Sequence, residues 1–67
     1  MELLIIKAGS DYIRVREGEY LRVGLDKASV FPMDRLPMVR THESRLKQGG
    51  FQAVRIKKLI LTEEDLA

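Results

Sequence analysis

The chain has 67 residues, no Cys and one His, and its 12 Lys and Arg residues exceed its 10 Asp and Glu residues to give a net charge of +2 at pH 7. A chain of this length forms one domain, residues 1–67, and buries only about 60% of the surface exposed in its unfolded state. Without Cys it has neither disulfides nor a thiolate zinc site, so a reducing, cytoplasmic location is expected. Its apolar run at residues 3–6 is far shorter than the about 20 residues of a membrane span or the apolar region of a signal peptide.

The charges are distributed unevenly along the chain. Glu63, Glu64 and Asp65 stand among the last five residues, and without them the chain carries twelve basic and seven acidic residues, a net charge of +5. A basic body followed by an acidic, flexible tail at residues 62–67 is able to attract phosphate groups or acidic proteins.

Residues 2–7 predict the first strand. The Leu-Leu-Ile-Ile run at residues 3–6 places apolar side chains on both faces, which is typical of an interior strand. Residues 8–11, Ala-Gly-Ser-Asp, then predict a turn.

Residues 11–23 predict a β-hairpin, because apolar and polar side chains alternate along them. The apolar set comprises Ile13, Val15, Leu21 and Val23. If this set shares one face, Val15 pairs with Leu21 and residues 17–19 form a three-residue loop. A two-residue turn pairs Val15 with Tyr20 and mixes the faces, so the three-residue loop is preferred.

A short strand is expected at residues 28–31, ended by Pro32. The only helix is predicted over residues 34–48, with Asp34 as the N-cap and Pro37 in the first turn. Gly49 is the expected C′ residue that ends the helix. The apolar stripe of the helix, with His42 in the same row, consists of Leu36, Val39 and Leu46.

Residues 54–61 predict the last strand, in which the apolar pattern changes phase. Val54 and Ile56 share one face, whereas Leu59 and Leu61 share the other. Two explanations remain open: a β-bulge between the two pairs restores the phase, or the Leu-Ile-Leu run is buried on both sides by a partner or by the tail. The tail itself has room for one helical turn at most.

The element order β-β-β-(β)-α-β predicts an α+β fold: a small two-layer domain with a mainly antiparallel sheet of three to five strands and one helix on one face. Residues 27–31 read Lys-Ala-Ser-Val-Phe and follow an apolar strand and a Tyr-containing hairpin. In these features the chain resembles short orphan proteins of bacterial phages and mobile elements. The resemblance implies this topology and a bacterial or phage context, but the group has no common activity. Pro37 departs from the more regular helices of that group.

The sequence offers few residues for catalysis or metal binding. Ser44 stands two positions after His42 and does not face it on a helix, so the two cannot act as nucleophile and base. His42 is expected to be a partly buried helix residue, because it shares the stripe of Val39 and Leu46; a partner-contact or pH-sensitive residue is the alternative. No second imidazole or Cys accompanies it as a metal ligand. Gly49 and Gly50 follow a helix, where capping is expected, and do not precede one as a phosphate-binding loop does. No enzyme, metal, cofactor or small-molecule substrate is predicted.

One group of residues is a candidate binding site. The three-residue loop gathers Arg and Tyr side chains on the outer face of the hairpin, and the last strand adds one more Arg. The candidate binding face comprises Tyr12, Arg14, Arg16, Tyr20, Arg22 and Arg55. Pairing on this face places Arg14 beside Arg22, which is destabilising unless a partner neutralises them.

Three interpretations of this face remain open. Tyr and Arg are enriched at protein–protein hot spots, so the first is a non-catalytic module for a protein partner or for self-association as a homodimer, which the apolar run at residues 59–61 also favours. The second is a nucleic-acid-binding module, because Arg binds phosphates and Tyr stacks on bases. The third is that the face is only the solvated side of the sheet.

Overall fold

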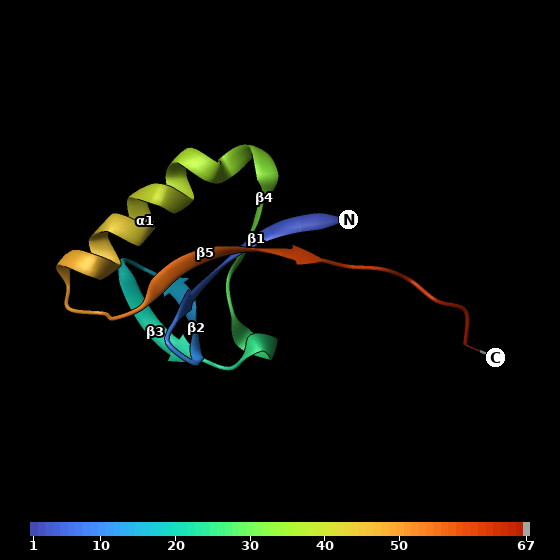
Figure 1. Ribbon diagram of the computed structural model, residues 1–67, viewed down its shortest axis with the longest axis horizontal. Coiled ribbons are helices and arrows are strands. Elements are labelled where there is room, and N and C mark those ends of the chain that lie inside the picture. The colour runs from blue at the N-terminus through green and yellow to red at the C-terminus, as the bar shows by residue number, and fades with distance from the viewer. Residues whose placement is uncertain (67) are drawn as a thin grey trace.

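The structure is a computed structural model that describes residues 1–66. Its elements in chain order are β1 (Glu2–Ala8), β2 (Asp11–Arg16), β3 (Glu19–Val23), the 3₁₀ helix η1 (Leu25–Lys27), β4 (Val30–Pro32), the 3₁₀ helix η2 (Met33–Arg35), α1 (Leu36–Gln48) and β5 (Val54–Ile60). The strands form one five-stranded antiparallel sheet, and α1 crosses one face of it (Figure 1). The predicted two-layer α+β domain is confirmed.

The central strand of the sheet is β1. It pairs along its whole length with β5, while its other edge is shared by β4 at residues 3–5 and by β2 at residues 7–8. Because strands flank both edges and side chains cover both faces, Leu4, Ile5 and Ile6 are all buried. The interior strand predicted from the apolar run is therefore confirmed.

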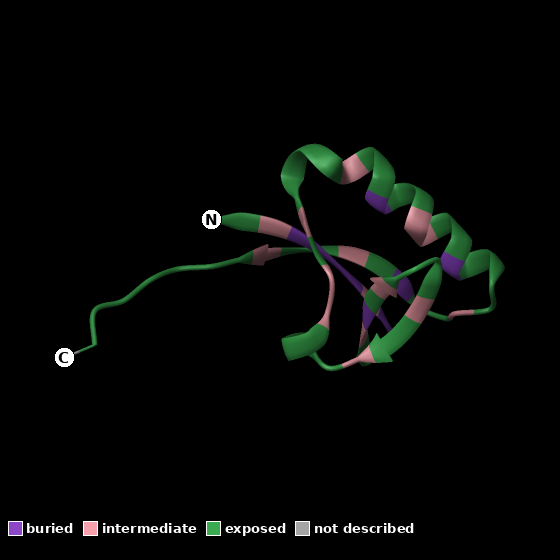
Figure 2. Cartoon of the chain, turned by 180° about the vertical axis from the view of Figure 1, so that it is seen from behind, coloured by how far each residue is buried: buried purple, intermediate pink, exposed green. Residues whose placement is uncertain are grey.

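The main core lies between the sheet and α1. The sheet contributes Ile6, Ile13 and Val54, and the helix contributes Val39 and Leu46. Figure 2 shows the buried residues of α1 on the side that faces the sheet. The thin apolar stripe of the sequence is thus sufficient to hold the helix on the sheet.

Both ends of α1 differ from their predicted form. Residues 33–35 take the tighter 3₁₀ turn, so the helix begins at Leu36 with Arg35 as an N-cap that makes no side-chain hydrogen bond, and Asp34 is not the cap. At the other end Gly50, with φ of 90°, adopts the left-handed conformation, and Gly49 does not.

A Schellman motif closes the C-terminal end of α1. The Phe51 N–H donates to the Leu46 carbonyl at 3.1 Å and the Gly50 N–H donates to the Lys47 carbonyl at 3.2 Å. This turn packs the Phe51 ring against the core.

The hairpin of β2 and β3 corrects the predicted register. Val15 pairs with Tyr20 and Arg16 with Glu19, so the loop has two residues and the predicted three-residue loop is wrong. Glu17 and Gly18 have φ of 47° and 79°, as a type I′ turn requires. The twist of this turn matches that of the strands, and this preference outweighs the cost of moving Leu21 to the opposite face from Ile13.

Strand β5 contains no bulge. It pairs with β1 residue by residue from Val54 to Ile60, so Val54 and Leu59 lie on opposite faces of the sheet. Burial of the Leu-Ile-Leu run on both sides is not seen within the described residues, since Ile60 is 62% exposed and Leu61 is 44% exposed. The bulge prediction was wrong because the pairing with β1 tolerates apolar residues on both faces.

The remaining segments lie at the periphery of the sheet. The short strand β4 spans residues 30–32, slightly later than predicted, and includes Pro32. Residues 62–66 of the acidic tail have no regular secondary structure and are exposed, and Ala67 lies outside the described residues. Within residues 1–66, no helix has the length and apolar character needed to cross a membrane.

Candidate functional site

Strand pairing sorts the sheet side chains onto two faces. Residues paired directly in an antiparallel sheet point to the same side, and neighbours along a strand point to opposite sides. Ile6 and Ile13 point toward α1 and belong to the main core. Lys7, which pairs with both Tyr12 and Arg55, therefore lies with them on the side opposite α1, named here the open face.

The candidate binding face of the sequence is divided between the two sides of the sheet. Tyr12, Arg14, Arg16 and Arg55 lie on the open face. Tyr20 and Arg22 pair with Val15 and Ile13 and lie on the helix side. The division follows directly from the two-residue turn.

The two residues on the helix side make contacts within the domain. The Tyr20 hydroxyl lies 2.7 Å from His42 Nδ1 and forms a hydrogen bond with it. The Arg22 guanidinium lies 4.4 Å from the centre of the Phe51 ring and 3.9 Å from an Asp11 carboxylate oxygen. Both residues therefore support the packing of the hairpin near α1.

The open face carries a cluster of positive charges from three neighbouring strands. The five open-face cations are Lys7, Arg14, Arg16, Arg55 and Lys57. Arg14 pairs with Leu21 and not with Arg22, so the predicted repulsion between the two arginines is absent. Among the paired residues of β1, β2, β3 and β5, Glu19 is the one acid on this face. No ion pair within the described residues involves an open-face cation.

Two members of this cluster, Lys57 and Lys7, are absent from the candidate binding face predicted from the sequence, and Lys7 had no predicted role at all. It was placed at the end of an interior strand. The alternation of β1, continued one residue further, gives the position of Lys7 on the side opposite Ile6. Its Nζ lies 5.0 Å from the centre of the Tyr12 ring.

A small hollow lies beside Tyr12 on the open face. Its volume is about 200 Å³, and its lining includes Ile5, Tyr12, Leu25, Lys57 and Leu59. This is several times the about 30 Å³ that a water molecule occupies in the liquid. The open face thus offers a partly apolar recess whose lining includes two cations, Lys57 and Lys58.

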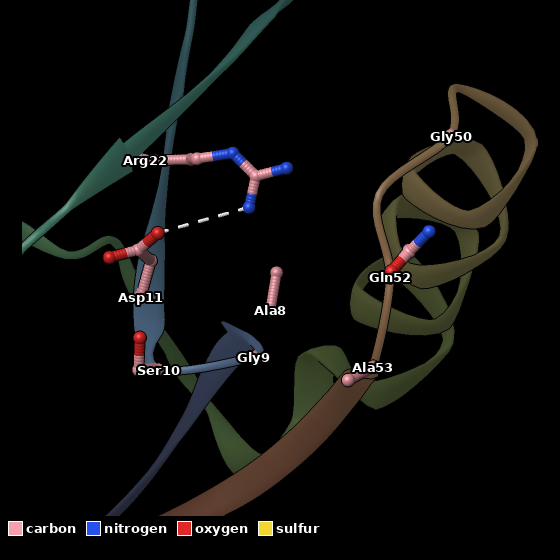
Figure 3. A pocket seen from close by; sticks show the side chains of 8 residues that line it. All are labelled: Ala8, Gly9, Ser10, Asp11, Arg22, Gly50, Gln52 and Ala53. Carbon is pink, nitrogen blue, oxygen red and sulfur yellow. Dashed lines mark ion pairs between the residues drawn. The ribbon is translucent and has the colours of Figure 1, made fainter.

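A larger and more open hollow of about 480 Å³ lies where the β1–β2 turn faces the loop between α1 and β5 (Figure 3). Its two charged residues, Asp11 and Arg22, face each other at 3.9 Å, and both side chains are 51% exposed. Ser10 supplies the one hydroxyl side chain of this lining, and no histidine is among the lining residues. These residues do not make a nucleophile–base pair.

His42 is half-buried, as expected from its place on the helix. Its ring centre lies 5.6 Å from that of Tyr20 and 5.9 Å from that of Phe31. Burial lowers the pKa of His42 below its ordinary value of 6.5, and the positive charge of Arg45 lowers it further. The ring is therefore neutral at pH 7 and belongs to the packing between hairpin and helix.

No three His, Cys, Asp or Glu side chains of residues 1–66 come together in a group able to hold a metal ion. The chain matches no protein family model, no curated protein and no solved structure. The open face is therefore interpreted from its own geometry and charge.

Proposed function

We propose that this protein is a non-catalytic, cytoplasmic module that binds single-stranded nucleic acid on its open face. The observation that carries the proposal is the set of five open-face cations on β1, β2 and β5, of which Lys7 lies 5.0 Å from the centre of the Tyr12 ring. Phosphate groups are the anions that such a set of Lys and Arg side chains binds through charge-assisted hydrogen bonds.

The arrangement of the cations suits a phosphate backbone. They come from β2, β1 and β5, which lie side by side, so their charges extend across the sheet. A strand of nucleic acid laid across the sheet meets several of them in succession. Binding of this kind releases counterions and weakens steeply as salt is added.

Tyr12 and the hollow beside it favour a single strand over a duplex. Bases of a single strand are free to stack on aromatic rings, whereas bases of a duplex are already stacked on each other. The apolar recess over Ile5 and Leu25 is placed to receive the edge of such a base. Stacking on an aromatic side chain contributes about 1–3 kcal/mol per base.

The structure changes the balance between the two binding hypotheses of the sequence. The hypothesis that a protein partner binds this face assumed that two tyrosines and three hairpin arginines share one surface. Tyr20 and Arg22 instead contact His42 and Phe51 within the domain. The face that remains is rich in cations, including Lys, which is depleted in protein interfaces.

The test is titration of a fluorescently labelled single-stranded oligonucleotide at low and at moderate salt. We expect binding whose affinity falls as salt rises. Replacing Arg14 and Arg55 by Gln is expected to weaken binding roughly tenfold or more, and to reduce the salt slope by about 0.7 for each phosphate contact removed.

The matched control is the replacement of Arg40 and Lys47 by Gln. Both are exposed residues of α1, on the other side of the sheet, so the net charge changes equally while the open face stays intact. Circular dichroism spectra check that both double variants are folded. Equal losses of affinity in the two double variants, or no binding at low salt, would contradict the proposal.

A further inference from the structure

Strand β5 leaves one edge of the sheet open. Within the described residues it pairs with β1 alone. Beyond Ile60 the chain continues outward from the sheet, and Figures 1 and 2 show this segment extended and exposed. It is also apolar in part, since Ile60, Leu61 and Leu66 are 62%, 44% and 101% exposed.

The hydrogen bonds of β5 identify which backbone groups face the open edge. Met1 and Leu61 exchange two bonds, of 3.1 Å from the Met1 amino group and 2.8 Å from the Leu61 N–H. Bonded and non-bonded pairs alternate in an antiparallel ladder, so the odd-numbered residues of β5 bond to β1. The even-numbered residues, Val54, Ile56, Lys58 and Ile60, direct their N–H and C=O groups to the open edge.

The sequence around this edge is complementary to itself when a second copy runs antiparallel with Ile60 opposite Ile60. The pairs, one residue from each copy, are Ile60–Ile60, Leu59–Leu61, Lys58–Thr62, Lys57–Glu63, Ile56–Glu64, Arg55–Asp65 and Val54–Leu66. Even-numbered residues meet even-numbered residues in this register, as the open hydrogen-bonding groups require. On each side of the central Ile60–Ile60 pair there are two ion pairs and two apolar pairs, Leu59–Leu61 and Val54–Leu66.

We propose that two copies of this chain form a homodimer in which β5 and the acidic tail of one copy pair antiparallel with the same segment of the other. The register centred on Ile60 brings the acids of each tail beside the bases of the opposite β5. Direct cross-strand pairs of opposite charge and of apolar side chains are the contacts that stabilise a sheet.

A second copy fits this edge better than a neutral strand does. Lys57 and Lys58 stand in the middle of β5, and lysines on an edge strand oppose pairing with chains that carry no complementary charge. Lys58 is already neutralised by Glu2 at 3.4 Å and needs no acid opposite. Arg55 and Lys57 make no ion pair within the described residues, and they meet Asp65 and Glu63 of the second copy.

Sedimentation equilibrium of the protein alone, from micromolar to millimolar concentration, tests the proposal without nucleic acid. We expect a dimer. Glu63→Lys together with Asp65→Lys is expected to weaken dimerisation roughly tenfold or more, because each new Lys faces Lys57 or Arg55 of the second copy. Both positions are exposed and lie outside the sheet, so the domain folds normally.

A complementary variant makes the test specific to the register. Lys57→Glu together with Arg55→Glu also opposes self-pairing, but an equimolar mixture of the two double variants restores every ion pair and is expected to form a heterodimer. The single variant Glu63→Lys is also expected to weaken dimerisation, and its matched control is Glu64→Lys, which makes the same charge change at the next residue but faces Ile56. Glu64→Lys is expected to dimerise as the unchanged protein does.

Three results would overturn the dimer. They are a monomer at the highest concentration, a Glu64→Lys variant as impaired as Glu63→Lys, or no heterodimer in the mixture of folded variants. Because no oligonucleotide is present, each of these results leaves the proposed nucleic-acid function unaffected.

Discussion

His42 connects the hairpin to the helix. Its Nδ1 bonds to the Tyr20 hydroxyl, and its ring lies near Phe31, so one imidazole contacts residues from β3 and β4. Sequence reasoning assigned His42 a half-buried position on the helix but no partner, because Tyr20 was expected on the outer face. The partner depends on the hairpin register, which local spacing did not determine.

The lowered pKa of His42 predicts a pH dependence of stability. The folded state binds the proton less readily than the unfolded state, whose His has an ordinary pKa of 6.5. The contribution of the neutral His42 ring to the free energy of unfolding is therefore complete above pH 6.5. It is lost as the pH falls from this value toward the pKa of His42 in the folded state. Urea unfolding measured between about pH 5 and 7 should show stability rising with pH.

The His42→Gln variant isolates this contribution. We expect His42→Gln to be less stable at every pH and to lose most of the rise of unfolding free energy with pH between about pH 5 and 7. Tyr20→Phe keeps the ionisable His42 ring and is expected to retain a pH dependence. An unchanged slope in His42→Gln would assign the pH dependence to other groups.

In the β2–β3 hairpin, the alternation of apolar and polar residues predicts the strands but does not determine the length of the loop between them. The pattern of residues 11–23 correctly predicted two strands and their approximate bounds. It did not give the loop length, because Glu17 is not a typical residue for a left-handed position, and the cost of exposing Leu21 was overestimated. A one-residue change in loop length then moved Tyr20 and Arg22 to the other face.

Glu17 gives a prediction at this scale. Asn tolerates the left-handed conformation better than Glu, and Asn-Gly is the preferred pair for a type I′ turn. Glu17→Asn is expected to raise the free energy of unfolding by about 0.5–1 kcal/mol, measured by urea denaturation. Glu19→Asn, the same replacement in β3, is the control and should be neutral or destabilising. A loss of stability in Glu17→Asn would contradict the assigned turn.

Among the five open-face cations and Tyr12, four residues belonged to the binding face predicted from the sequence: Tyr12, Arg14, Arg16 and Arg55. Arg14, Arg16 and Tyr12 were assigned correctly to one side of β2, since alternation within a strand is local. The grouping of Lys7 with Tyr12 and Arg55 depends on how β1 pairs with β2 and β5, and the loss of Tyr20 depends on the length of the β2–β3 turn. The same limit applies to β5, where pairing with β1 removed the need for a bulge.

At the scale of the whole molecule, the proposed dimer and the proposed nucleic-acid site share residues. Glu63 and Asp65 of one copy lie beside Lys57 and Arg55 of the other, on the same side of the continuous sheet. The acids therefore neutralise part of the open face whenever the dimer forms. Dimerisation and nucleic-acid binding are expected to oppose each other.

A pair of variants with equal net charge tests this opposition. Glu63→Lys removes an acid that faces Lys57, whereas Glu64→Lys removes one that faces Ile56. We expect Glu63→Lys to bind the labelled oligonucleotide several-fold more tightly than Glu64→Lys at protein concentrations where the unchanged chain dimerises. Equal affinities of the two variants would show that net charge alone sets the binding.

The pairing of β1 with β5 also has a consequence for how the chain acquires its structure. The paired residues of this ladder stand between 46 and 58 positions apart, from Ala8–Val54 to Glu2–Ile60. Closing so large a loop costs conformational entropy before the β1–β5 contacts form. We therefore expect the pairing of β1 with β5 to limit the rate of folding. During synthesis the buried residues Leu4, Ile5 and Ile6 of β1 are made long before β5. In newly made chains the edge of β1 that pairs with β5 is therefore open until β5 is in place, which favours aggregation.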